Sequence, residues 1–470
     1  MNGSEVTVPV AVGSDADETS TGFTDAVLDR FDAIVFDDLP AEAVACAKEC
    51  VLDVVGVALA GWSEPESTMV FDYATSAYGA GPATVLGTQH RIAPEGAALV
   101  NGTLAHAHDY DDTSWSYIGH GSAVILPAAL AVGEAQGASG RELIGAFVAG
   151  LEVAALVGAP LTGDFARRGW HLTSAVGVLG AAAAAGRLLG LDRDGLARAL
   201  GVAAARAGGL KASFGYMAKP YQVGLAASGG VQAARLAQSG LTACPTALEA
   251  PLGYFSAFAD AQAPPSVAGP LSIVADGVAF KRYPSCTGSH PAVDGVLAIV
   301  ADTGIRGADV QSIRVGTTPE VPGELVHPRP ATGAQAKFSM PFAVAVALIH
   351  GDLKIEHFTD AMVTDRAIGE LMDRCEVFVD ADLDRPVGVR APAASVEIVT
   401  ADGRAHRRRI ELARGNPGRP LSHVELVAKF RDCATRRLDE PSVTALLARA
   451  EALEHIGDVA ELLAATRSTT

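Results

Sequence analysis

Residues 39–61, LPAEAVACAKECVLDVVGVALAG, predict a long amphipathic helix that indicates the fold class. Pro40 stands where a first helical turn tolerates proline, apolar residues recur at spacings of three and four, and Gly61 ends the pattern. The same pattern returns in segments that are mostly joined by short glycine-containing turns: 94–108, 123–136, 140–157, 173–189, 194–207 and 224–239. We therefore expect an all-α region over this part of the chain.

From about Ser272 the pattern changes to alternating β-branched and polar residues, which is typical of half-buried strands. The predicted strands are SIVADGVAFKRYPSC (272–286), VQSIRVGTT (310–318), CEVFVD (375–380) and ASVEIVTADGRAHRRRIE (394–411), with helices at 290–302 and 342–350 between them. After these, Ser422 and Glu425 have the spacing of a capping box and restore a helical pattern.

These patterns predict a mainly α protein with two domains. We expect a disordered tail at 1–20, a large all-α domain formed by both ends of the chain (21–271 and 413–470), and a smaller inserted α+β domain at 272–412.

The amino-acid composition limits the kinds of binding partner and the cellular compartment that we expect. The 470 residues carry a net charge of −18, which argues against a nucleic-acid-binding protein. The apolar stretches 143–161 and 174–189 are interrupted by Glu152 and Arg187, so we expect core helices and no membrane partner. Six scattered cysteines without a CxxC pair, and an acidic start without a signal-peptide core, favour a cytoplasmic protein. There is no glycine-rich phosphate fingerprint for ATP or a dinucleotide.

Four segments gather residues that could carry chemistry: NGTLAHAHDYDDT with GHGSA (101–113 and 119–123), GWHLTS (169–174), KASFGYMAKPYQVG (211–224) and FKRYPSCTGSHP (280–291). Each segment also has a structural interpretation. The aspartates could cap a helix, His171 could be a satisfied structural histidine, the lysines could lie on the surface, and Cys286 could be an apolar filler.

Taken together and in order, these segments resemble the MmgE/PrpD family. The likeness continues through LEAPLGYF (248–255), AKFSMPFAVAVALIHGDL (336–353) and NPGRPLSHVELVAKF (416–430), and covers most of residues 35–435. The resemblance implies this two-domain fold, a homodimer, a small polycarboxylate as substrate, and an active site between the domains without metal or other cofactor. Two departures stand out: the spacing from Thr113 to His120 is one residue longer than in the decarboxylase pattern, and Phe342 replaces a frequent tyrosine.

By motif, the resemblance places Asp109, His120, His171, Lys219 and Lys281 among the catalytic residues. Substrate binding is expected to involve a second set: Thr113, Arg282, Tyr221 and Cys286. Histidine and lysine suit abstraction of a proton next to a carboxylate, because they supply both the base and the cations that stabilise the developing charge. We hypothesise that the two lysines hold substrate carboxylates, that the two histidines exchange protons, and that Asp109 orients one imidazole.

The same carbanion can lead to different products. We place dehydration of a hydroxy di- or tricarboxylic acid first, with decarboxylation or epimerisation as the alternative. A more remote interpretation takes His106, His108 and Asp109, with Asp111 and Asp112, as ligands of a divalent metal in a hydrolase, although residues two apart on a helix point to different faces. A helical scaffold without catalytic activity is the last possibility, and the clustering of histidine, aspartate and lysine argues against it.

Overall fold

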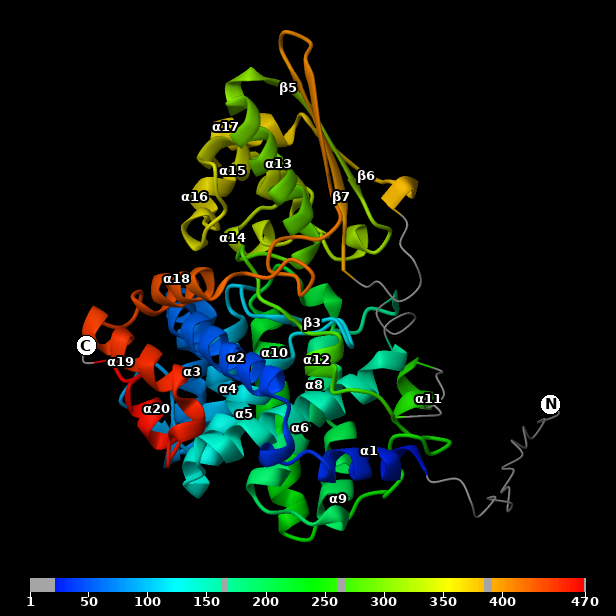
Figure 1. Cartoon of the computed structure of the whole chain (residues 1–470), viewed down its shortest axis with the longest axis vertical. Helices are drawn as coiled ribbons and strands as arrows, with labels where there is room; N and C mark the ends of the chain where they lie inside the picture. Colours follow the sequence, from blue (N-terminus) through cyan, green and yellow to red (C-terminus); the bar gives the residue numbers. More distant parts are fainter. Residues whose placement is uncertain (1–21, 162–166, 260–266, 384–390, 469–470) are drawn as a thin grey trace, which may run out of the picture.

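The computed structural model describes residues 22–161, 167–259, 267–383 and 391–468. The predicted tail at 1–20 lies outside these residues. Figure 1 shows a large helical body below and a smaller lobe of helices and sheet above it. The prediction of a mainly α fold with a smaller α+β part is confirmed.

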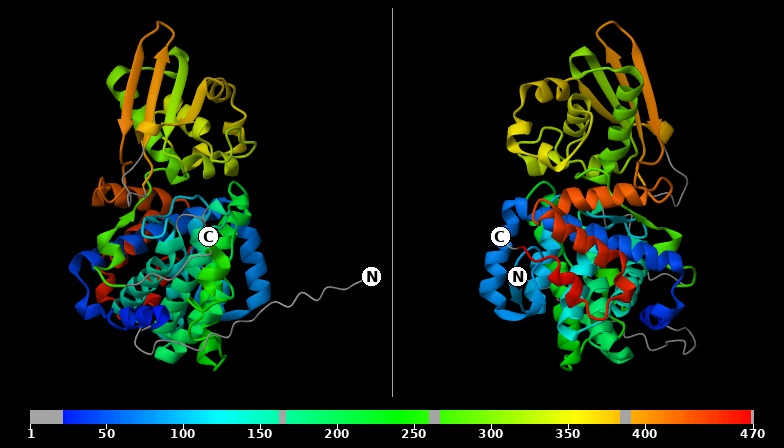
Figure 2. Two further views of the ribbon diagram at one scale, coloured as in Figure 1. Left: turned by 90° about the vertical axis from the view of Figure 1, so that its right-hand side faces the viewer. Right: turned by 60° about the vertical axis from the view of Figure 1, so that its left-hand side comes forward.

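The helical body draws its helices from both ends of the chain, as the colours in Figures 1 and 2 show. Its N-terminal helices are α1 (Phe23–Asp32), α2 (Ala41–Ala60), α3 (Pro65–Tyr78), α4 (Pro94–His106), α5 (Gly121–Gln136), α6 (Gly140–Gly158), α8 (Leu172–Leu188), α9 (Arg193–Ala204), α10 (Ala218–Gln238), α11 (Tyr254–Ala259) and α12 (Ser272–Ala275). The C-terminal helices α18 (His423–Ala434), α19 (Glu440–Glu451) and α20 (Ala460–Ala464) return to it, and α18 packs on α2. Two short strands, β1 (Ala80–Thr84) and β2 (Arg91–Ile92), form a hairpin beside α5.

Small residues set the spacing at the centre of this body, where α4, α5, α8 and α10 pack together. A Cβ atom added to Gly224 of α10 would lie 2.2 Å from the carbonyl oxygen of Leu99 in α4. Between α6 and α8, a Cβ on Gly150 would lie 2.6 Å from the carbonyl oxygen of Gly180. The Ala- and Gly-rich composition therefore allows close approach of the helix backbones.

The apolar segment that contains α6 bears on the expectation of no membrane partner. Within the described residues, Gly140–Leu161 is long and apolar enough to span a membrane by length and composition. It packs against α5 and α8, and Val148, Ala149 and Leu151 are almost completely buried. This burial is that of a core helix.

The smaller lobe is built on a four-stranded sheet with the order β6-β5-β7-β8. Its elements are α13 (His290–Thr303), β5 (Val310–Thr317), α14 (Gly333–Ala336), α15 (Met340–His350), α16 (Asp360–Val363), α17 (Arg366–Met372), β6 (Cys375–Val379), β7 (Ala394–Thr400) and β8 (Ala405–Ile410). Strands β5 and β6 run parallel, whereas β5 with β7 and β7 with β8 run antiparallel. Helix α13 packs on β7 and β8, so one face of the sheet is covered.

The predicted strand at 272–286 is wrong over most of its length. Residues Ser272–Ala275 form α12, and only β4 (Val278–Ala279) is extended, paired with β3 (Thr113–Ser114). Gly277 has a φ of +67°, in the left-handed region, and Pro284 cannot donate to a sheet, so the alternation of side chains does not produce a continuous strand. The β3–β4 pair instead connects the segment before the smaller lobe to the loop after α4.

Candidate active site

The loop between α4 and α5 carries a dense group of buried polar side chains, which includes His108, Asp109, Asp111 and Asp112. Helix α4 ends at His106, and His120 occupies the N-cap position of α5. Between them Asp109 has a φ of 51°, in the left-handed region that is uncommon for residues other than glycine. The loop therefore turns sharply at Asp109.

The Asp109 carboxylate lies between two ammonium groups. Its Oδ1 accepts hydrogen bonds from Lys219 Nζ at 3.1 Å and from Lys281 Nζ at 2.8 Å. Burial alone would raise the pKa of Asp109, but the charges of Lys219 and Lys281 hold it well below its usual value. Asp109 is therefore an ionised anchor for two cations and a weak base.

Lys219 lies near the start of α10, where it meets residues from three other segments. Its Nζ lies 2.5 Å from His106 Nε2. The same atom lies 5.2 Å from the centre of the Phe214 ring and 5.0 Å from the centre of the Phe338 ring. Burial, together with the nearby charge of Lys281, lowers the pKa of Lys219, and Asp109 opposes this shift. The ammonium group is held by a carboxylate, an imidazole and two aromatic faces.

His171 precedes α8 and is fixed by Gln222 of α10. Gln222 Nε2 donates to Ser213 Oγ at 2.7 Å, so its Oε1 is the acceptor that lies 3.1 Å from His171 Nδ1. Burial and the charge of Lys219 lower the pKa of His171 well below its ordinary value. A neutral imidazole that donates through Nδ1 keeps the lone pair on Nε2, and this is the form that a general base requires.

A cavity of about 770 Å³ lies between the helical body and the smaller lobe. The body contributes Asp109, Thr113, Trp115, Ile118, His120, Arg167, Gly169, His171, Leu172, Thr173, Lys211, Phe214 and Lys219. The smaller lobe and its approach contribute Cys286, Thr287, Gly288, Pro319, Glu320, Val321, Gly323, Glu324, Phe338 and Pro392. The cavity therefore combines the histidine and lysine groups with residues from both parts of the molecule.

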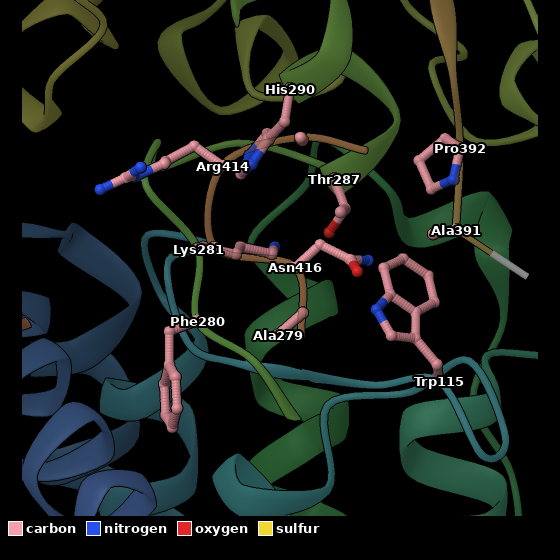
Figure 3. A pocket seen from close by; sticks show the side chains of 12 residues that line it. Trp115, Ala279, Phe280, Lys281, Thr287, His290, Ala391, Pro392, Arg414 and Asn416 are labelled. Carbon is pink, nitrogen blue, oxygen red and sulfur yellow. The ribbon is translucent and has the colours of Figure 1, made fainter. Parts of the chain in front are cut away.

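A smaller pocket adjoins this cavity and shares Trp115, Thr287 and Pro392 with it. Figure 3 shows Lys281 and Asn416 in this pocket, together with Thr287 and Trp115. Lys281 is only 2% exposed and donates to both Asp109 Oδ1 and the Asp109 carbonyl oxygen. Lys281 thus supports Asp109 from behind the main cavity.

Apart from Lys281, which lines the adjoining smaller pocket, the predicted site residues divide into two groups. Asp109, Thr113, His120, His171, Lys219 and Cys286 all line the main cavity. Tyr221 and Arg282 do not: Tyr221 packs against the helical core, and Arg282 lies near the Tyr283 ring and 3.9 Å from Glu425. Tyr221 stands two residues after Lys219, and Arg282 directly follows Lys281, but the side chains of both residues point away from the cavity.

The metal interpretation of His106 and His108 does not match the geometry. His106 contacts Asp111 and Lys219, whereas His108 Nε2 lies 3.1 Å from the Ala60 carbonyl oxygen, so the two rings serve different surroundings. A different set, His106, Asp109, Asp111 and His120, has ligand atoms within 4.8 Å of one another. The Lys219 ammonium group already lies between His106 and Asp109 in that set, in the place of a metal ion.

Several contributors to the site were not singled out from the sequence. Gln222 orients His171, and Phe214 and Phe338 flank Lys219. Lys211, one of the two lysines considered in the segment 211–224, also lies in the cavity wall, 3.6 Å from Glu324. Gln222 and Phe214 stand in a quoted segment, but only the tertiary contacts give them a role. Asp111 belongs to the aspartate cluster of the first segment, but its contact with His106 is visible only in the structure.

Comparison with known proteins gives the same family over most of the chain. Residues 30–266 match the model of the MmgE/PrpD N-terminal domain, and residues 283–455 match that of the MmgE/PrpD C-terminal domain. A cis-aconitate decarboxylase of Homo sapiens is 30% identical over 431 residues, which cover 88% of each chain. A cis-aconitate decarboxylase of Aspergillus terreus is 26% identical over 491 residues, covering 94% of this chain and 95% of the relative.

Proposed function

The chain belongs to the MmgE/PrpD family, and we propose that it is a cofactor-independent decarboxylase of an unsaturated polycarboxylic acid, with cis-aconitate as the first substrate to test. The relatives support a lyase, and they favour decarboxylation over the dehydration that we placed first from the sequence. The observation that carries the proposal is the meeting of Lys219, His120 and His171 at one cavity. Those groups can bind carboxylates and transfer a proton.

Decarboxylation of this type requires charge stabilisation and one proton. When the bond between carbon and the leaving carboxylate breaks, CO₂ departs and the bonding electron pair moves through the adjacent double bond towards a conjugated carboxylate. One proton added to carbon then completes the product. An enzyme therefore needs cations close to the remaining carboxylates and an acid on one face of the substrate.

We assign these tasks to the cavity-lining groups. Lys219 binds a substrate carboxylate and stabilises the electron pair as it develops, because its ammonium group is held at the cavity wall. His120 is the proton donor that we propose, and its Nε2 lies 3.6 Å from Asp109 Oδ1. Neutral His171 keeps the lone pair of Nε2 free of a proton and accepts a hydrogen bond from a protonated substrate carboxyl.

Lys281 has a different role in this proposal from the one expected. The Lys281 ammonium group donates a hydrogen bond to Asp109 and is almost completely buried. In this proposal Lys281 therefore neutralises the Asp109 carboxylate and does not hold a substrate carboxylate directly. The cavity offers Lys211 and Arg167 as further cations. Both are suitable for the outer carboxylates of a di- or tricarboxylate.

The test is incubation with a panel of unsaturated and hydroxylated polycarboxylates, including cis-aconitate and citrate, with NMR detection of products and measurement of CO₂. We expect CO₂ from an unsaturated member. Lys219→Ala should lower its release about 100-fold or more. Lys354→Ala, a change at an exposed lysine, serves as the control and should retain full activity. Loss of water from citrate without CO₂ release would support dehydration and overturn the proposal.

A further inference from the structure

His106 is buried at the end of α4 and has a partner on each ring nitrogen. Its Nδ1 lies 2.9 Å and 3.0 Å from the two oxygens of Asp111, and its Nε2 lies 2.5 Å from Lys219 Nζ. His106 is absent from the cavity lining, whereas Lys219 is part of it. The ring therefore connects a buried carboxylate to a cavity-lining ammonium group without reaching the cavity itself.

The hydrogen-bonding capacity of the partners determines the tautomer of His106. Although burial favours the neutral acid, the interactions with His106 and His120 hold the pKa of Asp111 well below its usual value. An ionised carboxylate can only accept hydrogen bonds, and an ammonium group can only donate them. His106 must consequently carry its proton on Nδ1 and direct the lone pair of Nε2 towards Lys219.

Burial, with the charge of Lys219, lowers the pKa of His106 to about 4, although Asp111 opposes the shift. The imidazole is therefore neutral near pH 7, and the array from Asp111 through His106 to Lys219 has a single consistent proton arrangement. The second oxygen of Asp111 lies 3.1 Å from His120 Nδ1, which also lies 2.8 Å from the Asp112 carbonyl oxygen. Asp111 thus contacts both imidazoles, but only His106 depends on its carboxylate for an acceptor.

We propose that Asp111 and His106 are positioning residues, in which Asp111 fixes the Nδ1-protonated tautomer of His106 and the Nε2 lone pair of His106 holds the Lys219 ammonium group at the cavity wall. This inference rests on the proposed function in one respect, namely that Lys219 binds a substrate carboxylate. The tautomer of His106 and its contact with Lys219 are properties of the unliganded protein.

Substitution of Asp111 by asparagine separates charge and hydrogen bonding from shape. An amide offers one acceptor and one donor group, whereas a carboxylate offers two acceptors. His120 can keep its bond to the Asp112 carbonyl oxygen, so the change is felt at His106, whose ring loses its anionic partner. If the amide turns its N–H towards Nδ1, the proton of His106 must move to Nε2. The Nε2–H group would then face the Lys219 ammonium group, donor against donor, and could not accept its hydrogen bond.

The first experiment records ¹⁵N NMR spectra of histidine-labelled protein without substrate, with His106→Gln identifying the His106 signals. In the wild type we expect a protonated Nδ1 and an unprotonated Nε2 at His106, and in Asp111→Asn a change of those shifts. Asp112→Asn is the matched control. Burial raises the pKa of Asp112 to about 8, so its side chain is uncharged near pH 7, as asparagine is. A wild-type His106 protonated on Nε2, or Asp111→Asn with unchanged shifts, would overturn the inference.

The second experiment measures binding of a saturated probe, propane-1,2,3-tricarboxylate, by calorimetry. His106→Leu removes the acceptor for Lys219, whereas His106→Gln can provide a carbonyl oxygen in its place. We expect His106→Leu to weaken binding about tenfold or more and His106→Gln to retain most of the affinity. Equal affinity of His106→Leu and the wild type would contradict the positioning role.

The two experiments separate failure of this inference from failure of the proposed function. If the wild type neither binds the tricarboxylate nor releases CO₂ from unsaturated acids, the proposed function is wrong, while the NMR spectra still decide the tautomer. If the wild type binds and turns over the acid but His106→Leu behaves identically, the positioning role alone is wrong.

Discussion

The ammonium group of Lys281 donates to both the side chain and the main chain of Asp109, at 2.8 Å to Oδ1 and 2.7 Å to the carbonyl oxygen. These two bonds hold Asp109 in a backbone conformation with a φ of 51°, which is unfavourable for a residue with a side chain. The contact joins the segment that enters the smaller lobe to the loop that follows α4. The contact between Lys281 and Asp109 therefore contributes both to the stability of the fold and to the position of Asp109 in the site.

Lys281→Met should destabilise the protein strongly, because it leaves the buried Asp109 carboxylate without one of its two cations. We expect the free energy of unfolding, measured by urea denaturation, to fall by about 3–5 kcal/mol. As a control, Arg366→Met breaks an exposed ion pair with Glu370 and should leave stability nearly unchanged. Similar small effects of both changes would show that Lys281 contributes little to the fold.

His108 should make stability depend on pH. Burial, with the charge of Lys337, lowers its pKa to about 3, whereas an unfolded histidine has a pKa of about 6.5. Between these values the unfolded chain binds the extra proton, so this contribution to stability is present above about pH 6.5 and is lost as the pH falls.

Comparison of the wild type with His108→Gln isolates this contribution, because the other titrating groups are common to both. From pH 7 to pH 5 the wild type should lose about 2 kcal/mol more free energy of unfolding than the variant does. Denaturation curves at both pH values provide the measurement. Parallel losses in the two proteins would mean that His108 is not buried as a neutral ring.

Gly224→Ala should disturb the packing that brings Lys219 to His106. The added methyl group would meet the Leu99 carbonyl oxygen and Thr103 Oγ1 at 2.2 and 2.3 Å, so α4 and α10 must separate. We expect a loss of about 1–3 kcal/mol in the free energy of unfolding together with reduced activity. Gly369→Ala, in α17, is the matched control because no atom lies within 4 Å of its added Cβ, and it should be neutral or stabilising. A fully active and stable Gly224→Ala would contradict this account of the α4–α10 contact.

The helices could be predicted from the sequence because apolar residues that recur every three or four positions mark the buried face of a helix. The prediction of 94–108 and the observed α4 differ by two residues, since the chain turns at Asp109. Helix α10 begins at Ala218, ahead of the predicted 224–239, because Pro220 is tolerated in a first turn. The strand prediction at 272–286 failed because alternation alone does not supply a pairing partner.

The candidate site was less accessible from the sequence than the fold. Its residue types were visible in four segments, but the tertiary contacts decide which neighbours belong to it. Lys219 and Tyr221 are two residues apart, yet only the lysine lines the cavity. The role of Asp111 depends on the directions of two imidazole rings, and no local pattern specifies those directions.

Excess chelator should leave activity unchanged. The Asp109 carboxylate is bonded to Lys219 and Lys281, and Asp111 to His106, so these acidic groups already have cationic or N–H partners. Turnover after dialysis against EDTA, with metal analysis of the dialysed protein, provides the test. Activity lost on chelation and restored by a divalent metal would support the metal interpretation of the cluster His106, Asp109, Asp111 and His120.

The most direct measurement of the central claim follows uniformly ¹³C-labelled cis-aconitate in deuterated water by NMR, with the wild type and Lys219→Met compared at equal concentration. We predict that the wild type releases one ¹³CO₂ for each molecule of product, that the product carries one carbon-bound deuterium, and that Lys219→Met is slower by about 100-fold or more. Absence of ¹³CO₂ with the wild type, or equal rates for both proteins, would contradict the account.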